Sequence, residues 1–214
     1  LLIGIFGFLG DKAAEFFYII LISFLHLLSS KLFSKKFGIH ENYFYILSLS
    51  FFVLINGLNV GSELLVLSMI QFFLAFFGTG WSPLFLGLAF LTRYNSFIFL
   101  PLLLFNWNLK KIIRDVLIFL LTISPWFIYN YIKTGNFLYG FVNSYALNVA
   151  FREYYIMGFD FMHVLLVINF LIPFFIIGLI FALRKFNKKH FMILLLLIFS
   201  LASYSTIPFK TPRY

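Results

Sequence analysis

Long apolar runs, separated by short polar segments, dominate this sequence and constrain its fold more than any other feature. Of its 214 residues, 63% are hydrophobic and 11% are charged, whereas a soluble domain is about half apolar and about a quarter charged. So few polar side chains could not coat a water-soluble core, so lipid must solvate much of the surface. Hydrocarbon offers backbone groups no hydrogen-bond partners, and a helix satisfies its own. The sequence therefore predicts an all-α, polytopic integral membrane helix bundle.

The net charge of +9 is concentrated in three short clusters, which the positive-inside rule places in the cytoplasm. Glu41 and Asp115 lie near the first two clusters. Because the charge lies in short loops rather than on one continuous face, nucleic-acid binding is not expected. The clusters are Lys31, Lys35 and Lys36; Lys110, Lys111 and Arg114; and Arg184, Lys185, Lys188 and Lys189.

These clusters assign a direction to each predicted helix. The chain is expected to begin with an external interfacial tail, residues 1–10. A later external segment, residues 134–160, is expected to lie along the interface. The predicted crossings are 13–33 inward, 42–58 outward, 64–78 inward, 113–131 outward, 161–183 inward and 191–207 outward.

Residues 84–107 are long enough for one ordinary crossing. A single crossing, however, would leave the second and third basic clusters outside. Both anomalies vanish if the segment is a half-membrane hairpin of two short helices, 83–91 and 97–107, that enters and leaves from the cytoplasmic side. Its tip would be the sequence LTRYNS at 91–96, since irregular backbone at membrane depth is tolerated where it lines a protein cavity.

Residues 1–214 show no soluble domain, no linker and no low-complexity tract, so a single transmembrane domain is predicted. The sequence begins without a methionine, inside an apolar stretch, and we interpret it as an internal fragment of a longer protein. It contains no cysteine, which excludes disulfides and thiolate metal sites.

Two charged residues stand out as candidate site residues. Glu63, in the external turn at 59–63, could hold Mg²⁺ or Mn²⁺, anchor a substrate by its charge, act in catalysis, or simply favour the dipole of a helix start. Arg93 lies among apolar residues, where a charge needs a partner. It could bind a phosphate, reach the interface, or pair with a structural carboxylate. Tyr94 and Asn95 could contact the same ligand or satisfy the helix break.

The remaining polar residues give weaker signals. Lys210 and Arg213 form an external basic pair that could clamp a phosphate or be ordinary loop charge. Tyr214 follows them directly. His26 and His163 lie on apolar helices and are interpreted as core histidines. No zinc-site spacing and no Ser/His/Asp triad is present in the sequence.

Three stretches together resemble a known family. They are LGLAFLTRYNSFIFLPLLL at 86–104, SPWFIYNYIKTGNFLYG at 124–140 and KTPRY at 210–214. Their order and spacing are similar to those of the polyprenyl-phosphate-sugar-dependent glycosyltransferases of the GT-C superfamily, in the protein O-mannosyltransferase and aminoarabinose-transferase branch. The resemblance extends over residues 1–214, although each motif is short.

The resemblance implies a GT-C-like fold in the cell membrane. It also implies transfer of a hexose or pentose, on the external face, from a polyprenyl-phosphate donor to a lipid, glycan or protein acceptor. Glu63 corresponds to a second acid at the outer end of a helix, Arg93 to the basic residue of the hairpin motif, and Arg213 and Tyr214 to a late Arg-Tyr. Substrate binding is expected at Arg93, Tyr94, Asn95, Lys210, Arg213 and Tyr214. The family's first external loop, with its acidic residue, lies upstream, so this fragment alone is expected to be inactive.

Two other classes stay open. In a transporter or lipid flippase, a broken hairpin with a buried arginine would be a substrate site. Comparison of residues 13–107 with 113–207 shows no convincing internal repeat, which disfavours that class. A structural membrane subunit is the third possibility.

Overall fold

The computed structural model describes residues 10–42, 45, 62–106, 108–148, 172–184 and 187–206. Every regular element in these ranges is helical, so the all-α prediction is confirmed. Two helices, α2 (Asp11–Phe37) and α7 (Leu109–Thr134), are long and apolar enough to cross a membrane. They support a membrane location, whereas crossing by the other helices stays a prediction.

The other helices fall close to the predicted segments. The predicted crossing at 42–58 lies outside the described residues apart from 42 and 45, and residues 1–9 and 149–171 also lie outside them. The remaining elements are α5 (Glu63–Ala75), α6 (Trp81–Thr92), the 3₁₀ helix η2 (Tyr94–Asn106), α8 (Tyr139–Asn148), α10 (Ile172–Arg184) and α11 (Lys188–Thr206).

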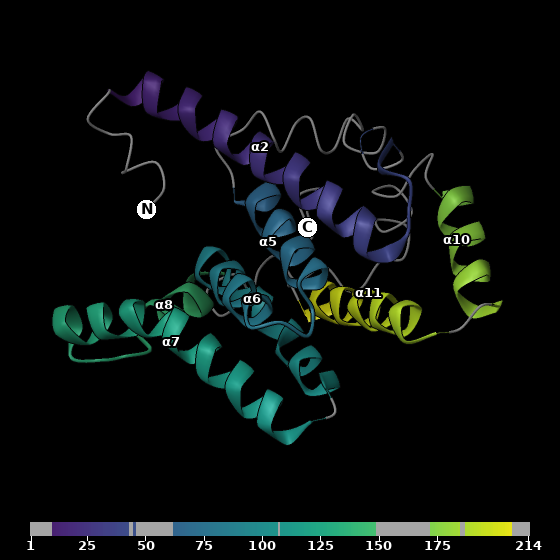
Figure 1. Ribbon diagram of the computed structural model, residues 1–214. Helices are drawn as coiled ribbons and strands as arrows, with labels where there is room; N and C mark the ends of the chain where they lie inside the picture. The colour runs from purple at the N-terminus through teal and green to yellow at the C-terminus, as the bar shows by residue number, and fades with distance from the viewer. Residues whose placement is uncertain are drawn as a thin grey trace. The chain divides into compact units, whose positions relative to one another are not determined.

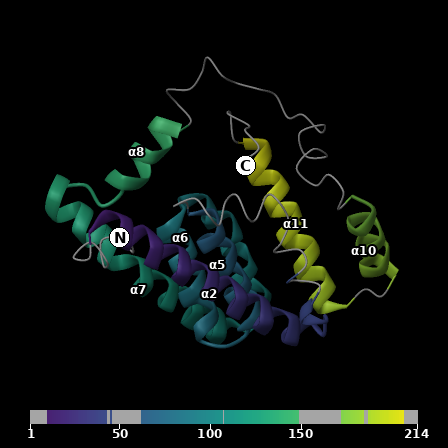
Figure 2. The same cartoon turned by 90° about the horizontal axis from the view of Figure 1, so that it is seen from above.

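The chain divides into two compact units. The first comprises residues 1–97 and 103–125, and therefore contains α2, α5, α6 and the first part of α7 (Figures 1 and 2). The second comprises residues 98–102 and 126–214. The candidate site, Glu63 with Arg93, lies in the first unit.

Helix α2 packs on α5 through a polar seam. The Ser29 hydroxyl donates to Gln71 Oε1 at 2.6 Å, and the Ser30 hydroxyl donates to the same oxygen at 3.3 Å. All three side chains are buried. Such interhelical hydrogen bonds contribute roughly 0.6–2 kcal/mol each between membrane helices. The small serines also let the two backbones approach closely.

The helix directions in the first unit follow from its contacts. Gln71, in the second half of α5, meets the second half of α2 at Ser29, while Glu63 at the start of α5 is within electrostatic range of Tyr18. Helices α2 and α5 therefore run the same way. The stacked rings of Phe72 and Phe85, 4.8 Å apart, belong to an antiparallel α5–α6 pair joined by the turn at 76–80.

Helix α6 crosses α7 closely while running in the same direction. A Cβ atom added at Gly80 would lie 3.5 Å from Ile118, and one added at Gly87 would lie 2.8 Å from the Thr122 Cβ. Later residues of α6 thus meet later residues of α7. The chain between them must therefore return to the end at which α6 began, as the hairpin prediction requires.

A helix break lies where the hairpin tip is predicted, and the helix that follows it is of the 3₁₀ type. The half-membrane hairpin itself stays a prediction. Helix α6 ends at Thr92, and η2 begins at Tyr94, so the break lies within the predicted 91–96. The second arm is a 3₁₀ helix of 13 residues, although such runs rarely exceed about four. Pro101 lies inside it. In an α-helix the Pro101 ring would clash with the carbonyl of Phe97.

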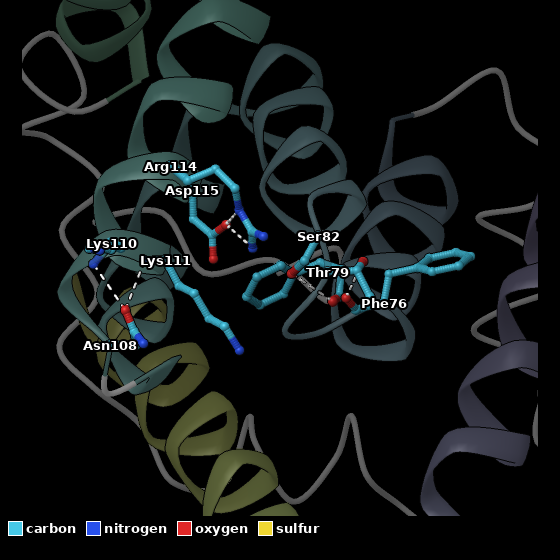
Figure 3. A network of polar contacts seen from close by, with 9 residues as sticks. Phe76, Thr79, Ser82, Asn108, Lys110, Lys111, Arg114 and Asp115 are labelled. Carbon is cyan, nitrogen blue, oxygen red and sulfur yellow. Dashed lines mark hydrogen bonds and ion pairs between the residues drawn. The ribbon is translucent and has the colours of Figure 1, made fainter.

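Helix α7 begins at a side-chain cap and carries a buried acid (Figure 3). Asn108 Oδ1 accepts hydrogen bonds from the backbone N–H groups of Lys110 and Lys111, at 3.0 and 3.4 Å. Asp115 is fully buried, and its Oδ1 accepts from Arg114 Nε at 2.9 Å and Nη2 at 2.7 Å. The Asp115 carboxylate is thus buried and paired with the Arg114 guanidinium of the same helix, rather than exposed in the loop before α7.

The second unit contains the C-terminal part of α7. The helix ends at Gly135, whose φ of 72° lies in the left-handed region that glycine tolerates best. Asn136 Oδ1 then accepts from the Leu138 N–H at 2.9 Å, just before α8 begins. Within this unit, Arg184 ends α10 and Lys188 begins α11, so these two members of the third basic cluster lie at helix ends.

These directions lead to a prediction for sidedness. Single cysteines at Lys35 and Asn108 are expected to react from the same side of the membrane, and one at Ser62 from the opposite side. The absence of native cysteine leaves no background. Labelling of sealed vesicles with an impermeant maleimide measures this, and a lysed sample controls for accessibility. Opposite sidedness of positions 35 and 108 would contradict the hairpin.

Candidate functional site

Glu63 and Arg93, predicted separately as site residues, form an ion pair. Arg93 Nη2 lies 3.4 Å from Glu63 Oε1, and the side chains are 29% and 22% exposed, respectively. The pair is therefore neither fully buried nor freely solvated. Of the interpretations considered for Arg93, the structure shows pairing with a carboxylate. A phosphate ligand stays a prediction.

The antiparallel α5–α6 pair brings these two residues together. Glu63 is the first residue of α5, and Arg93 directly follows the last residue of α6. An acid near a helix start and a base near a helix end are each favoured by the helix dipole, by about 0.3–1 kcal/mol. The position of Glu63 in the first turn of α5 therefore agrees with the interpretation that its charge favours the dipole of a helix start. The ion pair itself adds about 1 kcal/mol at this exposure.

Arg93 occupies the break in the hairpin. Its backbone is extended, with φ −146° and ψ 119°, so the helical hydrogen-bond pattern stops there. The Arg93 N–H still donates to the Ala89 carbonyl at 2.9 Å, and the Arg93 carbonyl accepts from the Ser96 N–H at 3.0 Å. The backbone polar groups of Arg93 are thus satisfied on both sides of the break.

Tyr94 and Asn95 extend from the same break. The Tyr94 ring lies 5.4 Å from the Phe90 ring, and Phe90 also contacts Phe97 and Phe119, with ring centroids 6.0 Å apart in each case. This aromatic cluster supports the hairpin tip. Asn95 is exposed. Tyr94, in contrast, is half-buried against the aromatic cluster.

Tyr18 is a site neighbour that sequence reasoning missed. It lies on the buried face of α2, within electrostatic range of the Glu63 carboxylate. The available signal was the spacing of Ala14, Tyr18 and Ile22, which marks one face of a helix.

The structure does not test the remaining predicted site residues. Lys210, Arg213 and Tyr214 lie outside the described residues. Within the described part of the chain, no group of three His, Asp or Glu side chains could hold a metal ion. Glu63 contributes one carboxylate that already faces a cation, which is a poor ligand set for Mg²⁺ or Mn²⁺. Metal binding at Glu63 stays a prediction that would need further acids.

Comparison of this chain with protein-family models, curated proteins and solved structures gives no match. Chemically, the described site is an arginine at a helix break that forms an ion pair with the Glu63 carboxylate.

Proposed function

We propose that this chain belongs to a membrane glycosyltransferase that moves a sugar from a polyprenyl-phosphate donor to an acceptor on the external face. The observation that supports this best is the Glu63–Arg93 pair. It lies at the end of the first unit opposite to the first two basic clusters. Under the positive-inside rule, that end faces outward.

Arg93 would bind the phosphate of the donor. When the glycosidic bond to the phosphate breaks, negative charge grows on the leaving phosphate oxygen, and a guanidinium stabilises that charge through paired hydrogen bonds. The extended backbone at Arg93 gives the guanidinium a position at the helix break rather than along a helix face. Asn95 could donate a further hydrogen bond to the sugar or the phosphate.

Glu63 would act on the acceptor. As the acceptor oxygen or nitrogen forms its bond to the sugar, it loses a proton, and a nearby carboxylate can take that proton. In the structure, this carboxylate faces Arg93. Binding of a phosphate to Arg93 would free Glu63 for the acceptor, so donor binding would precede activation of the acceptor. Further acids beyond the described residues could share this role.

The direct test is sugar transfer by the full-length protein. Purified protein is expected to release labelled sugar from a polyprenyl-phosphate donor and attach it to an acceptor. The same preparation in liposomes is also assayed for movement of the intact donor lipid between leaflets. Movement of the donor without transfer would reject the transferase and favour the transporter alternative.

A further inference from the structure

The first unit gathers lysines from two distant parts of the sequence at one end. Helix α2 continues past its contact with Gln71 and runs in the same direction as α5. Its last lysines, Lys31, Lys35 and Lys36, therefore lie toward the turn that joins α5 to α6. Helix α7 begins before its contact with Gly80, so Lys110 and Lys111 extend toward that same end. We call these five lysines, all of them exposed, the basic end.

Acidic groups offset this charge only in part. Asp115 is fully buried and accepts two hydrogen bonds from Arg114, so it presents no free negative charge. Glu41 follows α2 and is half-exposed. Asn108 already accepts from the N–H groups at the start of α7, so the lysine side chains, rather than the helix start, carry the positive field of the basic end.

An exposed tryptophan marks the same end independently of charge. Trp81 is the first residue of α6, beside the α5–α6 turn, and it is 61% exposed. Tryptophan is enriched where a bilayer meets water, because its ring is apolar and its N–H needs a polar partner. Lysines at that level reach the headgroups while their stems stay in apolar surroundings.

We propose that the basic end binds anionic phospholipid headgroups and concentrates them around Trp81. This inference rests on the prediction that the first unit lies in a membrane, and it is independent of the proposed sugar transfer. Clusters of about four to eight basic residues next to a membrane helix attract acidic lipids, each residue adding to the effect. The lysines reach from separate helices, which suits several headgroups along a bilayer surface better than one soluble anion.

Trp81 itself can report the local lipid composition. A parent variant with Trp107→Phe and Trp126→Phe keeps Trp81 as the single tryptophan. It is placed in phosphatidylcholine vesicles containing a minor fraction of brominated lipid, either phosphatidylglycerol or phosphatidylcholine. Quenching by the anionic lipid is expected to exceed quenching by the neutral one by about threefold. The excess should vanish in high salt, which screens exposed charges.

Matched variants locate the effect. Replacing Lys35, Lys36, Lys110 and Lys111 by glutamine is expected to bring the quenching ratio close to one, while quenching by neutral brominated lipid stays unchanged and confirms insertion. Lys12→Gln, an exposed lysine at the other end of α2, should keep the parent ratio.

Three results would each overturn the proposal. One is equal quenching by both lipids in the parent variant. Another is an unchanged ratio in the fourfold glutamine variant. The third is loss of the anionic excess on adding soluble glycerol phosphate at unchanged ionic strength, since the lysines would then bind free phosphate.

Discussion

Replacing Arg93 by alanine in the full-length protein is expected to lower the rate of sugar transfer by about 100-fold or more. That loss corresponds to roughly 2.7 kcal/mol of transition-state stabilisation, a usual value for removing one group that stabilises developing negative charge. Stability should fall by only about 1 kcal/mol, because the Glu63–Arg93 pair is partly solvated. Transfer assays alongside thermal melts in detergent separate the two effects.

Related variants divide the roles of the pair. Arg93→Lys should keep part of the activity, since a point charge still attracts phosphate without the bidentate fork. Glu63→Gln should leave donor binding nearly intact and slow the transfer step. Lys12→Gln removes an exposed positive charge outside the proposed site and should change neither quantity. Full transfer activity in a well-folded Arg93→Ala variant would show that the arginine is structural.

Replacing Gly87 by alanine is expected to destabilise the protein by about 1–3 kcal/mol. The new Cβ would lie 2.8 Å from both Cβ and Cγ2 of Thr122, so the α6–α7 crossing would have to open. Overpacking of this kind costs about that amount. A thermal melt should show a fall in Tm of about 3–10 °C.

Gly80→Ala is the matched control for this prediction. Its Cβ would lie 3.5 Å from Ile118 Cδ1, an ordinary contact with the flexible end of a side chain, so Tm should barely change. Thr122→Gly combined with Gly87→Ala tests the cause. The loss in the double variant should be smaller than the sum of the single losses, because the clashing group is gone. Strict additivity would mean that Gly87 and Thr122 are not in contact.

The charge pattern predicted how the described helices of the first unit run relative to one another, and their contacts agree with it. Which direction is inward stays a prediction. Lysines at the end of α2 and at the start of α7 required a return of the chain between α6 and α7, and the Gly87–Thr122 crossing shows that return. Polar residues at 91–96 also predicted the break. The 3₁₀ form of η2 was not predicted, because an apolar period does not distinguish two helix types over so short a segment.

The Glu63–Arg93 contact was available in the sequence but was not predicted. Glu63 lies fifteen positions before Gly78, and Arg93 lies fifteen positions after it. Gly78 has a φ of 89° and lies in the turn between α5 and α6. Because these helices are antiparallel and of similar length, the two helix ends farthest from the turn lie side by side. Locating the turn first would have paired the two residues.

The sequence did not predict which polar side chains are buried. Gln71 and Ser68 are the polar residues of α5 after Glu63, yet only the packing shows that Gln71 meets α2. Asp115 was grouped with the charges around the second basic cluster, whereas the structure encloses it with Arg114. These placements depend on which helix faces are opposed, and no local pattern determines that.

The seam between α2 and α5 also bears on the order of biosynthesis. Helix α2 is made first and is long enough to enter the bilayer by itself, whereas α5 is 13 residues long and carries both Glu63 and Gln71. A short helix with an amide near its middle partitions poorly into lipid alone. If α2 stays beside the translocation channel, its Ser29 and Ser30 hydroxyl groups can donate hydrogen bonds to Gln71 Oε1 as α5 leaves the channel. The earlier helix would then act as an intramolecular insertion chaperone for the later one.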